Sequence, residues 1–485
     1  MKKLAGLAVI LAVLILGSYY GMGIITERTL KKSIAMIDQS NGVLVEVDQY
    51  HRGLHRSTAL LNWRIQVPAR TTKNQEGVLV TVPAQEYKMQ VPLDISHGPI
   101  MFVDSKLKFG LGYARSHIAL DKAYADQFAK AYTAESTAPT VSLVLFVNYL
   151  NDSTLDVNMP MFKLIAKEGM SQFEWQGMNA ETHISSGYKK VKGRVTINGT
   201  IFQKDKASVT LGKVVSDFDL HRTPLRLYLG DGNISISSLV VMQESRKELD
   251  VKEFDAHSTS DIKDGLLSTH VKLTLSKLLT ADKVYGPALL DMSLSNLDAE
   301  TFVKINKQAN DLQHGSEADQ QKALLMLMPE LPKLLSKGAR FEISDLSVGM
   351  PEGQLKGNVL VTLPVEGTDN PFQLMQKITG QGKVMLSEAV LKHLMNDSAK
   401  ALLQQQEAVQ ASAEPAVAEV APVQAPVQQI DDPAVITKLA NEKLANMVQS
   451  GLLSLQGSDY VIEFKLAEGK LEINGKPFSS AMLTF

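Results

Sequence analysis

The stretch YKMQVPLDIS, Tyr87–Ser96, has the clearest two-residue repeat in the chain. Its apolar side chains stand at every second position and polar ones stand between them. Successive side chains of a β-strand point to opposite faces, so this stretch predicts a strand with one buried and one wet face. His97-Gly98-Pro99 follows it directly and predicts the end of the strand.

The same alternation recurs on both sides of this strand. It is found at Val43–Val47, Leu54–Val67, Leu107–Tyr113, Val141–Tyr149, Leu155–Met159, Phe173–Trp175, Val191–Ile201, Val209–Leu211, Ile234–Met242, Val271–Leu275, Phe341–Val348, Val359–Val365, Lys383–Leu386 and, as a closing hairpin, Tyr460–Ile473. Many short alternating strands predict an antiparallel sheet with one apolar face. The predicted fold class is mainly β with packed helices (α+β), an extended antiparallel sheet following an N-terminal transmembrane helix.

Five stretches predict helices: Asp121–Thr133, Ala299–Leu312, Glu317–Leu335, Ser387–Gln406 and Asp432–Leu453. The third carries a stripe of leucine and methionine, and its Pro329 and Pro332 should kink or end it. We interpret the stripe as a face packed on the sheet, with a docking face as the alternative.

The first stretch of the chain, Leu4–Ile25, contains no charged residue. At about 1.5 Å per residue it forms a helix of about 33 Å, enough to cross a bilayer core of about 30 Å. Tyr19 and Tyr20 are typical of residues at a membrane interface. We therefore predict an uncleaved signal anchor. The alternative is a secretory signal cleaved near Gly21 and Gly23.

The charges around this stretch do not decide its orientation. Two lysines precede it, and Arg28, Lys31 and Lys32 follow it. A long domain can translocate whatever its charge, so we expect a single-pass inner-membrane protein with the bulk of the chain in the periplasm.

The composition excludes several classes of function. The chain of 485 residues has 50 Lys and Arg against 52 Asp and Glu, without a basic block, which disfavours a nucleic-acid partner. It has no cysteine, which excludes disulfides, thiolate metal sites and a cysteine nucleophile. It contains no P-loop, dinucleotide fingerprint, HExxH or GxSxG motif. We predict no catalytic residue, cofactor or metal.

Composition and pattern divide the chain into five parts: an anchor at 1–25, a β-rich region at 26–298, helices with returning strands at 299–406, a Pro- and Ala-rich flexible linker at 407–430, and a C-terminal helix with a β-hairpin at 431–485. The linker lacks a usable period, which is typical of a segment without a packed face.

The most distinctive polar positions lie where strands end. Tyr50-His51-Arg52-Gly53 and His97-Gly98-Pro99 both read as turns, with a catalytic role as the alternative. His51 and His55 are four apart, but they flank the Arg52-Gly53 turn, so a metal site there is disfavoured.

These positions carry a resemblance that runs nearly from end to end. The motif positions, taken in order, are the N-terminal anchor, Tyr50, His51, Arg52, Gly53, His97, Gly98, Pro99, Tyr285, Gly286, Asn296 and Asp298, and the closing Gly469–Leu471 with Ile473–Gly475. In that order they resemble the YdgA/YihF-like family, bacterial proteins with a domain of unknown function that are associated with the inner membrane. The resemblance implies localisation and structural roles for these residues. It implies no reaction.

Three functions remain open. The first is non-enzymatic binding or transfer of a lipid or other apolar ligand on the concave face of a long sheet, by analogy of architecture with AsmA-like envelope proteins. The second is a scaffold that holds envelope protein partners near the membrane. The third, disfavoured by the missing motifs, is an envelope hydrolase. A continuous apolar groove favours the first, and a filled core favours the second.

Overall fold

The structure, a computed structural model, describes residues 2–35, 43–67, 70–73, 79–120, 122–312, 328–365, 376–412 and 433–479. The chain forms two compact units. Unit 1 comprises Met1–Asp250 and Phe302–Met328, and unit 2 comprises Val251–Thr301 and Pro329–Phe485. Each unit is built on antiparallel strands with a few helices, which confirms the mainly β prediction. The division between the units falls inside the predicted β-rich region 26–298.

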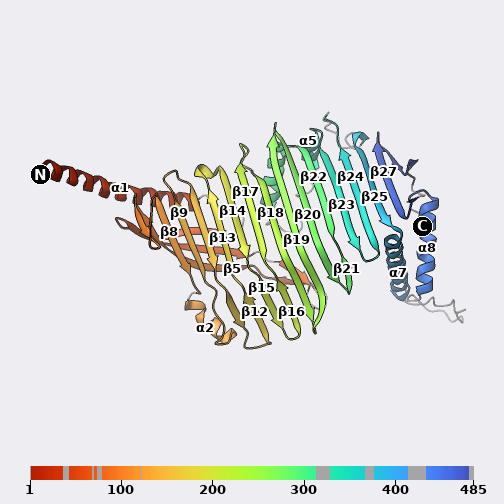
Figure 1. The fold of residues 1–485 in the computed structure, drawn as a ribbon, viewed down its shortest axis with the longest axis horizontal. Coiled ribbons are helices and arrows are strands. Elements are labelled where there is room, and N and C mark those ends of the chain that lie inside the picture. Colours follow the sequence, from red (N-terminus) through yellow and green to blue (C-terminus); the bar gives the residue numbers. More distant parts are fainter. Residues whose placement is uncertain are drawn as a thin grey trace. The chain divides into compact units, whose positions relative to one another are not determined.

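The strands of unit 1 follow one another as a meander. They are β1 (Val43–Arg52), β2 (Arg56–Val67), β3 (Arg70–Lys73), β4 (Leu79–Val82), β5 (Gln85–His97), β6 (Met101–Val103), β7 (Lys106–Lys108), β8 (Gly112–Ile118), β9 (Val141–Val147), β10 (Ser153–Met159), β11 (Phe162–Ile165), β12 (Ser171–Trp175), β13 (Met178–Ile184), β14 (Lys190–Ile197), β15 (Thr200–Lys204), β16 (Ala207–Leu211), β17 (Val214–Arg222) and β18 (Tyr228–Gln243). Antiparallel pairing runs in the order β1, β2, β5, β8, β9, β10, β13, β14, β17, β18 (Figure 1).

A second row of paired strands extends part of this sheet. Strands β11, β12, β15 and β16 pair with one another beyond the ends of β10, β13, β14 and β17, while β18 runs uninterrupted and pairs with both β16 and β17 (Figure 1). The predicted single strand Val191–Ile201 is therefore wrong, because it breaks between β14 and β15. Gly199 there has φ +144°, and a Cβ on it would lie 2.8 Å from the carbonyl oxygen of Leu211.

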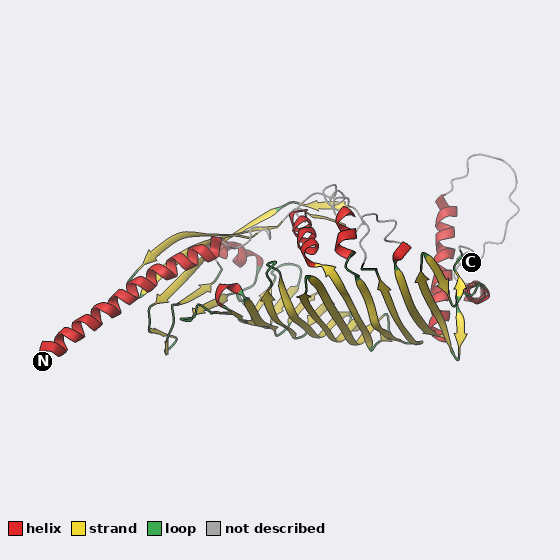
Figure 2. Ribbon diagram, turned by 90° about the horizontal axis from the view of Figure 1, so that it is seen from above, coloured by secondary structure: helices red, strands yellow, loops and turns green. Residues whose placement is uncertain are grey.

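Helix α1 (Lys2–Ala35) lies against the unit 1 sheet. Figure 2 shows strands of unit 1 on either side of the helix. Its Ile34 packs against the buried cluster of Val45, Leu61 and Val91. Across the side chains that the structure describes, we find no helix with both the length and the apolarity needed to cross a membrane.

Unit 2 is also built on an antiparallel meander. It contains most of β19 (Arg246–Lys263), then β20 (Leu266–Thr280), β21 (Lys283–Tyr285), β22 (Ala288–Asp298), β23 (Arg340–Met350), β24 (Gly353–Thr362), β25 (Thr379–Ser387), β26 (Ser454–Gln456), β27 (Asp459–Ala467), β28 (Lys470–Ile473) and β29 (Lys476–Pro477). Its main core lies where two helices, α7 (Glu388–Ser412) and α8 (Pro433–Gln449), cover the sheet. Val390, Leu391, Leu444 and Leu453 are buried there.

The shorter helices are α2 (Lys122–Ala131), η2 (Ser186–Tyr188), α3 (Ala299–Leu312), η3 (Met328–Glu330) and α5 (Leu331–Leu335). The predicted helices at Asp121–Thr133 and Ala299–Leu312 are confirmed by α2 and α3. Helix α7 extends to Ser412, beyond its predicted end at Gln406. Residues 413–430 of the predicted linker, and 317–327 of the predicted leucine and methionine helix, lie outside the described residues.

Candidate functional site

The motif positions of unit 1 gather around α1. The His97 side chain is completely buried, and its Nε2 lies 2.9 Å from Ser57 Oγ. Gly23 of α1 lies directly against the His97 ring. Arg52 bonds Glu27 of α1 across 3.3 Å, and its guanidinium lies 5.4 Å from the Tyr20 ring centroid.

The neighbouring motif positions hold the same helix. The ring of Tyr19 lies against Gly98, which has φ +129°, and its hydroxyl donates to the Ile100 carbonyl across 2.6 Å. Lys31 Nζ lies 5.8 Å from the Tyr50 ring centroid. The two motifs that we read as turns do end strands β1 and β5, and together they form a socket for α1.

The remaining motif positions of unit 1 serve the turns. The N–H of Gly53 donates to the carbonyl of Arg56 across 2.9 Å, and a Cβ on Gly53 would stand 2.3 Å from that oxygen. Pro99 accepts a hydrogen bond from the Tyr149 hydroxyl. His51 is exposed and pairs in register with Thr58. Among the described residues no group of three or more His, Cys, Asp or Glu could hold a metal ion.

The motif positions of unit 2 form a separate group. Gly286 has φ +108° and its N–H donates to the Gly349 carbonyl across 2.7 Å, beside Tyr285 at the end of β21. Asn296 Nδ2 donates to the Gly338 carbonyl. Asp298 caps α3, since its Oδ1 accepts from the backbone N–H and the hydroxyl of Thr301. These contacts support structural roles.

A pocket lies between the socketed half of α1 and the sheet. Its cavity volume is about 130 Å³. Its apolar lining comes from α1, β5, β9 and β13 and consists mainly of Ile25, Leu30, Ile95, Leu145, Val147 and Ile184. Thr26, Thr29, Asn151, Ser153 and Ser185 add polar groups at its wall. An apolar cavity of about 150 Å³ accepts a molecule the size of benzene, so this pocket has room for a short piece of an apolar chain.

The sheet continues this apolar lining beyond the pocket. Residues that face each other across adjacent antiparallel strands share one side of the sheet. By this register the pocket residues connect to a surface that we call the apolar face, made of Leu143, Leu155, Val157, Met159, Met178, Val191, Val195, Ile197, Val214, Phe218, Leu220, Ile234 and Ile236. All of these side chains are half-buried except Ile234, which is 45% exposed.

This degree of exposure distinguishes the apolar face from a core. From Val141 to Gln243, all of which the structure describes, only Phe162 and Leu229 are buried apolar side chains. Under α1, by contrast, Val91 is 1% exposed. The sheet therefore has a filled core beneath the helix and a half-exposed apolar surface beside it.

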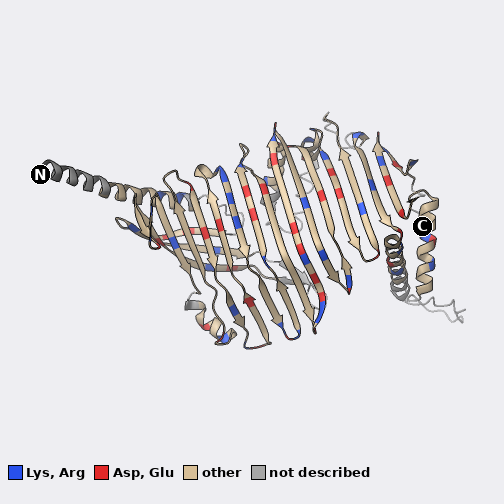
Figure 3. Cartoon of the chain, viewed as in Figure 1, with Lys and Arg blue, Asp and Glu red and all other residues tan. Residues whose placement is uncertain are grey.

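The opposite side of the sheet is polar. Lys190, Lys192 and Arg194 of β14 form ion pairs with Asp217 and Asp219 of β17. In Figure 3 the ribbon of β14 carries Lys and Arg positions, in blue, beside Asp and Glu positions, in red, on the neighbouring strand. These ion pairs make the polar side an ordinary solvent-exposed surface. The apolar face is therefore the unusual surface of unit 1.

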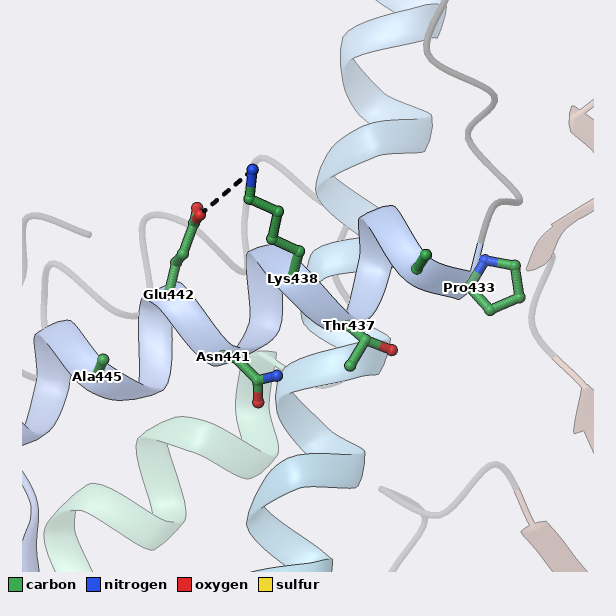
Figure 4. A pocket seen from close by; sticks show the side chains of 7 residues that line it. Pro433, Thr437, Lys438, Asn441, Glu442 and Ala445 are labelled. Carbon is green, nitrogen blue, oxygen red and sulfur yellow. Dashed lines mark ion pairs between the residues drawn. The ribbon is translucent and has the colours of Figure 1, made fainter.

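Two other concave regions are less suited to a ligand. One follows a single face of α8, where Pro433, Thr437, Asn441 and Ala445 are small or polar and Lys438 pairs with Glu442 (Figure 4). The other, of about 350 Å³, lies on the polar side of β2, β5 and β8. Both of its carboxylates lie near one guanidinium, because Arg115 lies 4.0 Å from Asp94 and 3.7 Å from Asp104.

The sequence indicated the two turn motifs but did not indicate that they contact helix α1. Tyr19 and Tyr20 read as membrane-interface residues, whereas in the structure they contact Ile100 and Arg52. The pocket residues of α1, Ile25 and Leu30, have no local signal that separates them from the rest of an apolar helix.

The comparisons with known proteins identify a family for this chain. No curated protein matches the chain. A family model described as a bacterial protein of unknown function matches residues 1–481. This confirms the resemblance to a bacterial family of unknown function, and the chain belongs to that family, DUF945.

Proposed function

We propose that this protein binds a lipid acyl chain or a similar apolar ligand along the apolar face of unit 1, without catalysing a reaction. The supporting observation is the contrast within one sheet. Val45, Leu61 and Val91 are buried where α1 covers the sheet, whereas the side chains of the apolar face, from β9 to β18, are half-buried or, at Ile234, exposed.

The shape of the surface favours a long ligand. The pocket under α1 takes only a short apolar segment, and its lining residues Leu145 and Ile184 stand beside Leu155 and Val191 of the apolar face. An acyl chain could place its end in the pocket and lie along the strands. Each methylene removed from water contributes about 0.8 kcal/mol, so a chain of this kind would bind firmly.

The proposal includes a place in the cell. We propose that Leu4–Ile25 anchors the protein in the inner membrane and that the bulk of the chain lies in the periplasm. The support is the uncharged apolar run of the sequence. Alkaline phosphatase fused after Phe485 should be active in cells, and an inactive fusion would reverse this topology.

A pair of adjacent residues tests the ligand. Val195 is half-buried on the apolar face, and the next residue, Thr196, points to the polar side. A photoreactive benzoylphenylalanine replaces each residue in turn in the full chain, and irradiated cells are analysed by mass spectrometry of the denatured protein. The variant at position 195 should carry lipid-mass adducts, and the variant at position 196 should not.

The same experiment separates the alternatives. Adducts with other proteins at position 195 would favour the scaffold function. Equal lipid labelling at both positions would show mere proximity to membrane and would contradict a binding face.

A further inference from the structure

Six large apolar side chains of unit 1 are exposed in two segments that lie together. We call them the exit patch: Ile100, Phe102, Leu107, Phe109, Tyr149 and Leu150. Phe102 is 67% exposed and Leu150 is 76% exposed. Single exposed apolar residues are common, but a cluster of this kind marks a contact surface.

The fold brings the two segments together. Phe102 and Leu107 face each other across the β6–β7 hairpin, so both lie on the same side of it. The turn between β9 and β10 carries Tyr149 and Leu150, and the Tyr149 hydroxyl donates to the carbonyl of Pro99, next to Ile100. The N–H of Leu111 donates to the Val147 carbonyl across 2.9 Å, which joins the hairpin's end to β9.

Helix α1 leaves the sheet at this patch. The Tyr19 hydroxyl donates to the carbonyl of Ile100, and Leu16 and Tyr20 beside it are about half exposed, 51% and 53%. Figure 1 shows the N-terminal part of α1 running beyond the strands of unit 1. The sequence of that part, residues 4–15, contains only apolar residues and one glycine.

We propose that the exit patch inserts into the interfacial layer of the lipid bilayer that the N-terminal part of α1 enters. A bilayer is favoured as the occupant because an uncharged apolar helix emerges beside the patch, so a membrane holding that helix must come to the same surface. Aromatic and leucine side chains flanked by lysines, here Lys106 and Lys108, are typical of interfacial contacts.

This contact would fix the orientation of unit 1 on the membrane. The proposal rests on the proposed membrane attachment and is independent of the proposed ligand. A helix tether by itself leaves the body free to tumble in water, whereas an inserted patch holds the β6–β7 hairpin at the headgroups.

The absence of cysteine makes the test direct, since any introduced cysteine is the only one. Full-length F102C and L150C, and the control K192C on the charged face of β14, are labelled with a polarity-sensitive fluorophore. Each is reconstituted into vesicles of phosphatidylethanolamine and phosphatidylglycerol and recovered by flotation. The Lys192 side chain is 64% exposed, so its label reports water.

The labels of F102C and L150C should emit at shorter wavelength and be quenched by nitroxide lipids, while that of K192C should not. Vesicles that float the protein with both patch labels still aqueous would overturn the proposal. If the labels become shielded only in native membranes, the patch binds a protein instead. A protein that does not float at all would defeat the membrane attachment itself. Circular dichroism confirms folding, and L150C, in a turn, serves if F102C misfolds.

Discussion

Gly23 of α1 lies so close to the ring of His97 that a Cβ atom on Gly23 would stand 2.7 Å from His97 Cε1 and 3.2 Å from both ring nitrogens. His97 is fully buried and hydrogen-bonded to Ser57, so the ring cannot move aside freely. Gly21, two residues earlier in the same helix, has nothing within 4 Å of such a Cβ. The contact requires a glycine at position 23 and not at position 21.

This contrast predicts the effect of two alanine substitutions. Gly23→Ala and Gly21→Ala each gain about 1 kcal/mol of helix propensity. Only Gly23→Ala must also push α1 off the His97 ring, at a cost of about 1–3 kcal/mol. Hydrogen exchange in β5 should accelerate in Gly23→Ala and stay unchanged in Gly21→Ala. Equal exchange in both variants would show that α1 does not dock on His97.

Burial of His97 predicts a pH dependence of stability. Burial lowers the pKa of His97 below its ordinary value of about 6.5, and the nearby His55 and Arg52 lower it further. The unfolded chain therefore binds more protons in the window just below pH 6.5, and stability falls there as the pH falls. Each tenfold difference in proton affinity corresponds to about 1.4 kcal/mol.

The measurement is urea unfolding of unit 1 at pH 7.5 and at pH 5.5, followed by the fluorescence of Trp63 and Trp175. His97→Gln should lose less stability between these pH values than the parent protein, because its side chain does not titrate. The exposed His183, replaced with Gln, is the control and should behave like the parent. A parent-like loss in His97→Gln would contradict the assignment.

A polar cluster in unit 2 predicts how α7 is held. Lys283 Nζ lies 3.1 Å from Glu352 Oε1 and 3.0 Å from Nε2 of His393, a residue of α7. Burial raises the pKa of Glu352, but the hydrogen bond from Lys283, a backbone hydrogen bond and the positive charge nearby together outweigh it and hold the pKa below its usual value. The carboxylate thus stabilises unit 2 above about pH 4.5, and this contribution is lost as the pH falls through the lowered pKa.

Removing that carboxylate should loosen the helix. Glu352→Gln should speed hydrogen exchange in α7 around His393 modestly, because the ion pair with Lys283 is partly exposed to water and screened. Glu388→Gln removes an exposed pair with Lys392 on the same helix and should change exchange little. Similar effects in both variants would mean that the cluster does not hold α7.

If the apolar face binds lipid, a substitution there should reduce lipid binding without lowering the stability of the protein. Val195→Asp places a charge on a half-buried position, so it should lower lipid crosslinking from a benzoylphenylalanine at position 143 several-fold. Thr196→Asp, on the polar side, should leave crosslinking intact. Both variants should unfold in urea close to the parent. Unfolding of Val195→Asp would place Val195 in a core, as Val91 is, and would remove the surface from consideration.

The sequence by itself determined the local elements of this protein. Alternation in Tyr87–Ser96 predicts a strand because side-chain direction is fixed by the backbone of that strand, and β5 confirms it. The helix at Ala299–Leu312 is confirmed to the residue, since Asp298 caps it through a contact only three residues away. The two turn motifs that contact α1 could be predicted as turns because they too depend on residues close together in the sequence.

Only the tertiary structure decided the rest. Strand β19 (Arg246–Lys263) was missed because its many charged residues hide the alternation, while its place in the sheet is fixed by backbone pairing with β20 along the hairpin that the two strands form. Val191–Ile201 has the pattern of one strand, yet Gly199 meets Leu211 and the strand breaks. Val91 and Val195 have the same alternation, but one is covered by α1 and the other is half-exposed. Periodicity shows which face is apolar, whereas burial depends on what the rest of the chain places against it.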